Sequence, residues 1–141
     1  MTAPQTADMA MLERAMGEVF SPYVQQLGLR LVAATPGEVT LELPVVPLHV
    51  HAGGVLCGQS MMAAADSAMV LAVMSKLGAF RPMTTVQLQT SFLKPIAGNA
   101  GTARVVATVL RLGKNLAFGE IRILAPNGDL AAHATTTYAL L

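Results

Sequence analysis

The stretch GGVLCGQSMMAAADSAM, Gly53 to Met69, is the part of the sequence that decides the fold. Alanine and methionine are strong helix formers, so the run predicts a long apolar helix over residues 58–77, which Gly78 ends. One carboxylate, Asp66, lies within it. An unpaired charge is costly to bury. Asp66 therefore needs either a structural partner, such as a serine or a backbone amide of a neighbouring strand, or a chemical role.

The composition bounds the size of the protein and the kind of partner it can have. A chain of 141 residues is enough for one domain, and only 12% of its residues are charged while 53% are hydrophobic. So few charges indicate that a second copy of the chain covers part of the surface, and we expect a homo-oligomer. The net charge of +1 gives no support for a nucleic acid or an acidic membrane as partner.

Basic residues are concentrated in one part of the chain. Seven basic side chains and one acidic side chain occur over residues 76–122: Lys76, Arg81, Lys94, Arg104, Arg111, Lys114, Glu120 and Arg122. They are either solvated loop and strand positions or a rim that receives a phosphate-bearing ligand.

The rest of the chain is predicted to form one further helix and six strands. After a loose leader, residues 1–6, helical spacing of apolar side chains predicts a helix over 8–20, so the segment 1–24 holds the leader and this helix. Alternation and turn residues predict strands over residues 29–34, 39–45, 84–93, 101–112, 116–124 and 130–140, the last four as a meander. One apolar helix needs a sheet curled around it, so we expect a single α+β domain over 1–141 with an antiparallel sheet.

The chain shows no sign of export or of a disulfide framework. Its single cysteine, Cys57, excludes an internal disulfide. The N-terminal MTAPQTADMA lacks the basic start and apolar run of a signal peptide, so we expect a cytoplasmic protein. The segment Leu56–Ser75 is long enough to cross a membrane, but Gln59 and Asp66 within it favour a buried helix of a folded domain.

Spacing along the long helix favours acyl-transfer chemistry. Five residues are predicted to share one helix face: Gln59, Met62, Asp66, Met69 and Val73. The first amides of the helix, near Gly58, are unpaired donors with a partial positive charge, and they can hold the oxyanion that develops on a thioester carbonyl. The Asp66 carboxylate can attack such a carbonyl or activate a water.

Two other chemistries remain open at the same segment. Cys57 stands at a helix start, where the pKa of a thiol is lowered, and His51 is near in sequence, so a Cys/His nucleophilic pair is possible. His49 and His51 are two residues apart and can ligate a metal if the segment is extended. No third ligand is evident, so we expect no metal. His133 is interpreted as a structural or rim residue of the last strand.

Four motifs, in this order and spacing, resemble the hotdog-fold acyl-CoA thioesterases of the phenylacetate-degradation type. They are GVLCGQ at 54–59, AADSA at 64–68, VQLQTSFLKP at 86–95 and RLGKNLAF at 111–118. The resemblance covers roughly residues 25–141 and implies one long helix wrapped by a curved antiparallel sheet. It also implies a homodimer with the active site at its interface, often doubled to a dimer of dimers, and hydrolysis of acyl-CoA without a cofactor.

The resemblance also assigns roles to individual residues. By similarity, Asp66 is the catalytic carboxylate, Gly58 is the backbone oxyanion donor, and Thr85 helps to place the attacking water from the partner subunit. His51 stands where an Asn or Gln often holds the thioester oxygen or the water. The turn formed by Gly113, Lys114 and Asn115 falls near the region that receives the coenzyme A end.

The helix start departs from the pattern of the family, in which His-Gly-Gly is common. Here Cys57, Gly58 and Gln59 occupy those positions, and we expect Cys57 and Gln59 to contact the substrate. The adaptable side chains of Met61, Met62, Met69 and Leu71, together with Phe80, are candidates for an acyl pocket, or are simply core. The alternatives to thioester hydrolysis are an enoyl-thioester hydratase that uses Asp66 with His51, and a non-catalytic module that binds acyl-CoA or another apolar ligand.

Overall fold

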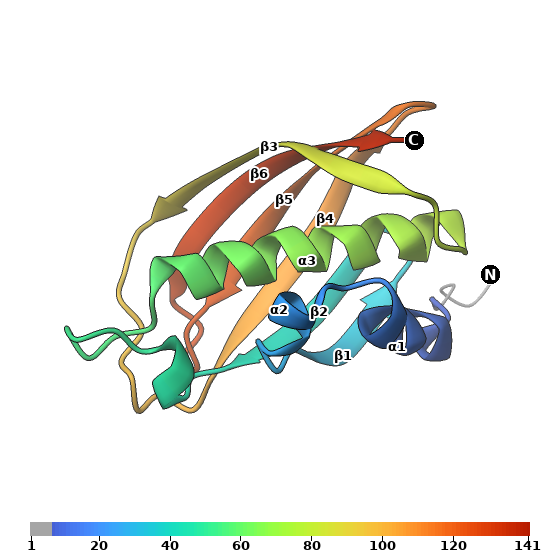
Figure 1. Ribbon diagram of the computed structural model, residues 1–141. Helices are drawn as coiled ribbons and strands as arrows, with labels where there is room; N and C mark the ends of the chain where they lie inside the picture. The colour runs from blue at the N-terminus through green and yellow to red at the C-terminus, as the bar shows by residue number, and fades with distance from the viewer. Residues whose placement is uncertain (1–6) are drawn as a thin grey trace, which may run out of the picture.

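The protein is a curved antiparallel sheet wrapped around one long helix. The computed structural model describes residues 7–141, and Figure 1 shows the sheet arching over the helix α3 with two shorter helices on the open side. The helices are α1 (Met9–Glu18), α2 (Pro22–Gln25), the single 3-10 turn η1 (Pro47–His49) and α3 (Gly58–Leu77). The strands are β1 (Arg30–Thr35), β2 (Glu38–Pro44), β3 (Met83–Phe92), β4 (Thr102–Leu112), β5 (Leu116–Leu124) and β6 (Leu130–Leu140). The predicted α+β hotdog fold is confirmed.

Polar caps fix where the N-terminal helices begin. The Asp8 side chain accepts the Met11 N–H at 3.0 Å and starts α1, and the Ser21 hydroxyl accepts the Val24 N–H and starts α2. Because Ser21 and Pro22 follow only two residues after α1, the helix predicted over 8–20 ends at Glu18 and a second short helix begins. The corner between α1 and α2 lies beside residues 66–70 in the middle of α3.

The order of the strands corrects the predicted meander. The sheet runs β1-β2-β4-β5-β6-β3, so β4, β5 and β6 form a meander but β3 pairs with β6 and not with β4. Residues 93–101 separate β3 from β4, which is too long for a tight hairpin turn. The Leu93 and Lys94 N–H groups instead both donate to the Ala131 carbonyl, which draws this segment across the end of β6. As a result β3 is an edge strand, and its residue Thr85 lies opposite Tyr138 of β6.

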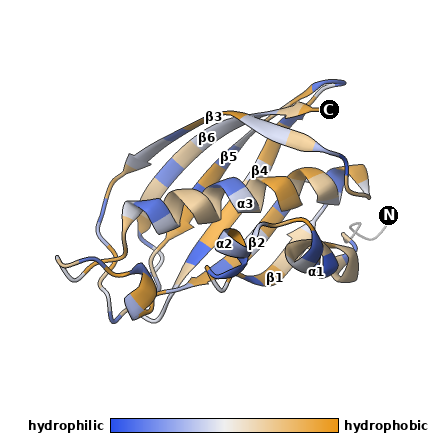
Figure 2. Ribbon diagram, in the orientation of Figure 1, coloured by the Kyte–Doolittle hydropathy of each residue, from blue (hydrophilic) through white to orange (hydrophobic). Residues whose placement is uncertain are grey.

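Small side chains let α3 lie close to the sheet. Ala64, Ala65, Ala68 and Ala72 are completely buried, and the Met69 side chain packs on Gly119 of β5. A Cβ on Gly119 would lie 2.3 Å from the Met69 Cε and 2.6 Å from the Thr108 carbonyl oxygen, so glycine is needed for this approach. Figure 2 shows α3 pale to orange over much of its length. The helix is long and apolar enough to span a membrane, yet 67% of its most apolar window is buried within the fold.

Candidate functional site

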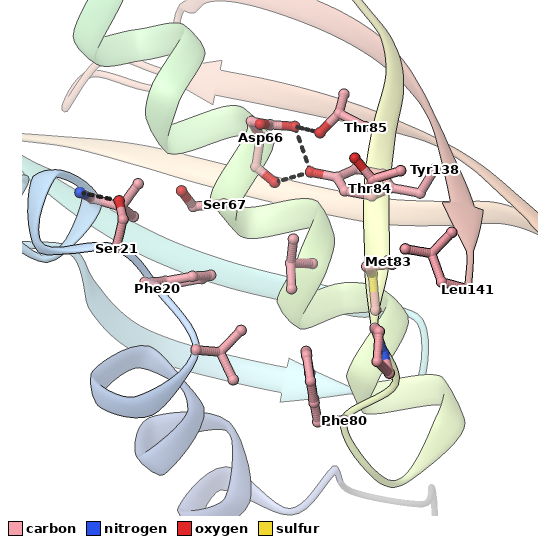
Figure 3. A pocket seen from close by; sticks show the side chains of 14 residues that line it. Phe20, Ser21, Asp66, Ser67, Phe80, Met83, Thr84, Thr85, Tyr138 and Leu141 are labelled. Atoms are coloured by element: carbon pink, nitrogen blue, oxygen red, sulfur yellow. Dashed lines mark hydrogen bonds between the residues drawn. The ribbon is translucent and has the colours of Figure 1, made fainter.

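The carboxylate of Asp66 is held by two hydroxyl groups from neighbouring strands. Asp66 lies in the middle of α3, and its Oδ1 accepts a hydrogen bond from Thr85 Oγ1 of β3 at 2.8 Å. The Tyr138 hydroxyl of β6 also donates to Oδ1, and its oxygen lies 2.6 Å from the Asp66 backbone carbonyl oxygen. Figure 3 shows the three side chains converging from α3, β3 and β6. The half-buried carboxylate thus has hydroxyl partners, whereas the sequence suggested a serine or a backbone amide.

The structure places Thr85 against Asp66 of the same chain. The resemblance had placed Thr85 at the active site from a partner subunit, but this hydrogen bond needs no second copy. The reason is the edge position of β3, which sets Thr85 opposite Tyr138 on the face of the sheet that α3 covers.

Tyr138 is the member of this group that the sequence analysis missed. Only 2% of its surface is exposed, and burial raises the pKa of its hydroxyl well above the ordinary value, a shift to which the negative charge of Asp66 and its hydrogen bond add. Tyr138 therefore stays a neutral donor. One signal for it was present: it shares the inward face of the last strand with Ala134 and Thr136, and a buried tyrosine hydroxyl nearly always has a partner.

A cavity of about 410 Å³ opens beside the Asp66 carboxylate. Its polar end is formed by Asp66, Thr85 and Tyr138, and Phe20 and Phe80 lie at the other end in Figure 3. The complete lining is Val19, Phe20, Ser21, Val24, Asp66, Ser67, Val70, Phe80, Pro82, Met83, Thr84, Thr85, Tyr138 and Leu141. The Ser21 hydroxyl accepts the Val24 N–H and the Ser67 hydroxyl donates to the Ala63 carbonyl. Valine, phenylalanine, proline, methionine and leucine side chains form most of the remaining wall.

Most of the side chains expected to form an acyl pocket belong to the core. Met61, Met69 and Leu71 are at most 4% exposed and do not line this cavity, and Met62 is half-buried but also outside it. Phe80 does line it. The difference arises because β5 and β4 cover the side of α3 that carries the long apolar residues, and the corner of α1 and α2 supplies apolar wall in their place.

The start of α3 lacks a side-chain cap. Cys57 is the N-cap residue but makes no capping hydrogen bond, so the first-turn amides, beginning with Gly58, have no acceptor within the helix. A Cβ on Gly58 would lie 3.1 Å from the Phe92 Cζ, so the ring of Phe92 lies against this backbone. Gln59 is exposed. The helix face predicted from Gln59 to Val73 therefore runs from exposed at its start to buried at its end.

Cys57 is joined to His49 through Ser60, not to His51. The Cys57 thiol donates to Ser60 Oγ at 3.2 Å, Ser60 Oγ lies 3.0 Å from His49 Nδ1, and His49 Nε2 lies 3.0 Å from the Leu27 carbonyl oxygen. Because a carbonyl can only accept, Nε2 carries the proton and Nδ1 accepts from Ser60. His51 is exposed, and its Nδ1 accepts the N–H of Gly53. The proposed Cys57/His51 pair is therefore not formed.

The same geometry argues against a metal site on the two histidines of this loop. His49 is 3% exposed with both ring nitrogens engaged, whereas His51 is exposed, so the two rings do not share a face. Within residues 7–141, no three side chains of His, Cys, Asp or Glu gather as a metal site would require. His133 pairs with Glu120 at 3.1 Å on the outer face of the sheet, which agrees with a rim position.

The turn formed by Gly113, Lys114 and Asn115 lines a second cavity, not the one beside Asp66. This cavity measures about 490 Å³ and is also lined by Arg111, Leu116, Phe118 and Thr137. Thr137 alternates with Tyr138 along β6, so the second cavity lies on the outer face of the sheet. The two cavities are nevertheless at the same end: the Arg81 guanidinium donates to the carbonyl oxygens of both Lys114 and Leu141, and Leu141 lines the Asp66 cavity.

Comparison with known proteins identifies the family. Residues 53–132 match the model of the thioesterase superfamily, which is more than half of the chain. The chain belongs to the thioesterase superfamily. This membership agrees with the curved sheet around α3 and includes both the Gly58 helix start and Asp66 in the matched region.

The chain is also similar to individual proteins. A relative from Thermoplasma acidophilum, named "Putative esterase Ta0293", is 25% identical over 82% of this chain and 86% of its own length. The zebra fish thioesterase superfamily member 2 is 26% identical, with 96% of this chain and 99% of that chain covered and a TM-score of 0.80. The E. coli PaaI protein, from the phenylacetic acid degradation operon, has the same fold: its TM-score is 0.79 at 21% identity, over 92% of this chain and 90% of its own.

Proposed function

We propose that the protein hydrolyses an acyl-CoA or aryl-CoA thioester to the free acid and coenzyme A. The observation that carries the proposal is the Asp66 carboxylate, held by Thr85 and Tyr138 at the polar end of an apolar cavity. A carboxylate in this position is suited to a reaction in which an apolar acyl group is bound and its carbonyl is attacked. Membership of the thioesterase superfamily supports thioester hydrolysis in general.

In the proposed reaction, Asp66 and the start of α3 act on opposite sides of the thioester carbonyl. Asp66 takes a proton from a water, the resulting hydroxide attacks the carbonyl carbon, and the N–H of Gly58 donates to the oxyanion that forms. Collapse of the tetrahedral intermediate breaks the C–S bond, and the coenzyme A thiolate leaves and takes up the proton. Direct attack by the carboxylate, which gives an anhydride that water then opens, uses the same groups.

The proposed site needs two copies of the chain. Gly58 and Asp66 are eight positions apart on α3, about 12 Å along its axis, so one carbonyl cannot contact both within one helix. The edge strand β3 is suited to pair with its counterpart in a second chain, since Val86 on it is 62% exposed and Phe92 is 49% exposed. A homodimer with antiparallel helices would bring Gly58 of one chain toward Asp66 of the other. Two such dimers would then associate as a dimer of dimers.

We assign the coenzyme A end to the basic side chains around the second cavity. Arg111 and Lys114 line it, and Arg81 lies between it and the Asp66 cavity. Arginine and lysine are the side chains that bind phosphate groups. Leu116 and Phe118 supply the apolar surface of the same cavity, which suits the adenine and pantetheine parts of the ligand. On this proposal the reaction uses no metal or other cofactor.

The test is release of free thiol from a panel of acyl-CoA esters of different size, with the wild type and Asp66→Asn. We expect hydrolysis by the wild type and a loss of at least 100-fold in kcat for Asp66→Asn, whereas Asp129→Asn, which removes an exposed carboxylate, keeps the wild-type rate. A wild type that is inert on the panel but binds the esters would favour the binding module. Loss of enoyl absorbance on an unsaturated ester, without thiol release, would favour a hydratase.

A further inference from the structure

The hydroxyl of Tyr138 lies against two different oxygens of Asp66. It donates to Oδ1 of the carboxylate, and its oxygen is 2.6 Å from the backbone carbonyl oxygen of the same residue. We propose that Tyr138 is a positioning residue that turns Oδ2 of Asp66 toward the substrate and keeps a hydrogen-bond acceptor when Asp66 takes up a proton. This inference rests on the proposed function.

The first part of the role is to fix the direction of the carboxylate. Oδ1 accepts from both Tyr138 and Thr85, which occupies its lone pairs in the plane of the carboxylate. Among residues 7–141, no side chain or backbone group donates to Oδ2. Because Asp66 lines the cavity, Oδ2 is the oxygen that remains for a water or a thioester carbonyl. A base held in one orientation does not have to be reoriented when the reaction begins.

The second part concerns the proton that Asp66 gains during the reaction. The ionised carboxylate is the stronger acceptor, so in the resting state the Tyr138 proton points to Oδ1. Once Oδ2 is protonated, Oδ1 is a weaker acceptor, and rotation of the phenolic proton directs it to the carbonyl oxygen 2.6 Å away. The buried hydroxyl therefore has an acceptor in both protonation states, and no heavy atom has to move.

The surroundings leave Asp66 and Tyr138 as the ionisable side chains of this cavity. All other side chains that line it are uncharged, and Arg81 lies behind the wall with its guanidinium on two backbone carbonyl oxygens. Burial and the charge of Asp66 raise the pKa of Tyr138, so the phenol remains a donor through the whole range in which the enzyme is expected to work. A change in the acid limb of the rate profile can therefore be attributed to the carboxylate and its partners.

A purely structural role is the rival explanation, since the same hydroxyl ties β6 to α3. Tyr138→Phe keeps the buried ring and removes only the hydroxyl. The matched control is Thr136→Val, which removes another buried hydroxyl of β6, one that donates to the Gln87 carbonyl oxygen at 2.8 Å and does not contact Asp66. A structural loss would lower stability in both variants and leave the kinetic constants alone.

For Tyr138→Phe we expect kcat to fall about 10- to 100-fold with KM within about twofold, because the apolar lining is unchanged. The acid limb of the kcat profile should move to higher pH, since the ionised carboxylate loses a donor. Thr136→Val should keep the wild-type kcat and profile. A Tyr138→Phe enzyme with unchanged kcat and an unchanged acid limb would overturn the inference.

If the panel of esters shows no hydrolysis, that result contradicts the proposed function but not the inference about Tyr138. A spectroscopic titration of Tyr138 then still tests the inference. The chain has two tyrosines and no tryptophan, so in Tyr23→Phe the phenolate absorbance reports Tyr138. Adding Asp66→Asn removes the negative charge beside the hydroxyl, and ionisation should begin at lower pH than in Tyr23→Phe alone. The same onset in both proteins would show that Tyr138 and Asp66 are not coupled and would overturn the inference.

Discussion

Ser60 donates a hydrogen bond to Nδ1 of the buried His49, and the backbone N–H of Cys57 donates to the His49 carbonyl oxygen at 2.8 Å. Both contacts end on His49, so this one residue of the preceding loop holds the start of α3 in place. The opposite ring nitrogen donates to the Leu27 carbonyl oxygen, so the helix start is also tied to the segment before β1. This arrangement keeps the uncapped amides of Gly58 and its neighbours in place without using them.

Ser60→Ala should destabilise the protein by about 1–3 kcal/mol, because it leaves Nδ1 of a buried histidine without a donor. The free energy of unfolding in urea measures the effect. Ser91→Ala, at an exposed position of β3, is the matched control and should change it by less than about 0.5 kcal/mol. Equal values for the two variants would mean that the contact between Ser60 and His49 adds nothing to stability.

Mixing two inactive variants should restore activity if the site is shared between chains. Asp66→Asn lacks the carboxylate, and Gly58→Val blocks the approach to the helix start. After unfolding and refolding of an equal mixture, half of the dimers carry one chain of each kind, and each of these has one intact site of two. We expect about a quarter of the wild-type rate per chain. A mixture as inactive as its components would place the whole site within one chain.

A methyl group on Gly58 should lower activity more than stability. In Gly58→Ala the new Cβ would lie 3.1 Å from Phe92 Cζ, and the half-exposed ring can shift outward by a few tenths of an ångström. The methyl group then stands between the substrate and the amide, and we expect kcat/KM to fall about 10- to 100-fold. Gly17→Ala is the control, since a Cβ there meets nothing within 4 Å; it should leave kcat/KM unchanged. Similar kinetics for both variants would remove Gly58 from the proposed site.

Tyr138 should make the folded state sensitive to alkaline pH. The folded-state pKa of its hydroxyl is raised above the ordinary value of about 10, so its stabilising effect is complete below about pH 10 and is lost as the pH rises further. Between pH 10 and 12 the free energy of unfolding of the wild type should fall relative to Tyr138→Phe by about 1.4 kcal/mol per pH unit. Urea unfolding at several alkaline pH values measures it. If the free energies of unfolding of the wild type and of Tyr138→Phe changed with pH in parallel, Tyr138 would ionise equally in the folded and unfolded chain.

Cys57→Ala should retain at least half of the wild-type rate of thioester hydrolysis. The thiol donates to Ser60 Oγ and reaches His49 only through that hydroxyl, so no base contacts the thiol directly to activate it as a nucleophile. The assay is again thiol release, with circular dichroism to check the fold. A folded Cys57→Ala protein that has lost more than 100-fold in rate would support the thiol as nucleophile instead of Asp66.

Local chemistry explains the parts of the fold that were predicted correctly. The apolar Ala and Met run after Gly58 and the left-handed Gly78 (φ 80°) fix the bounds of α3, because helix propensity and helix ends depend on neighbouring residues. The strand bounds follow from alternation and turn residues in the same way. Asp66 stood out because a single carboxylate in an apolar helix needs a partner, which is also a local observation.

The sequence alone therefore determined the long helix and the strands, and it singled out Asp66 as the candidate carboxylate. Only the tertiary structure decided that β3 pairs with β6, because strand order depends on how residues 93–101 cross the end of the sheet. That pairing sets Thr85 and Tyr138, 53 positions apart in the chain, on the same oxygen of Asp66. Contacts between distant residues are governed by packing of the whole sheet against α3, and no local pattern carries that information.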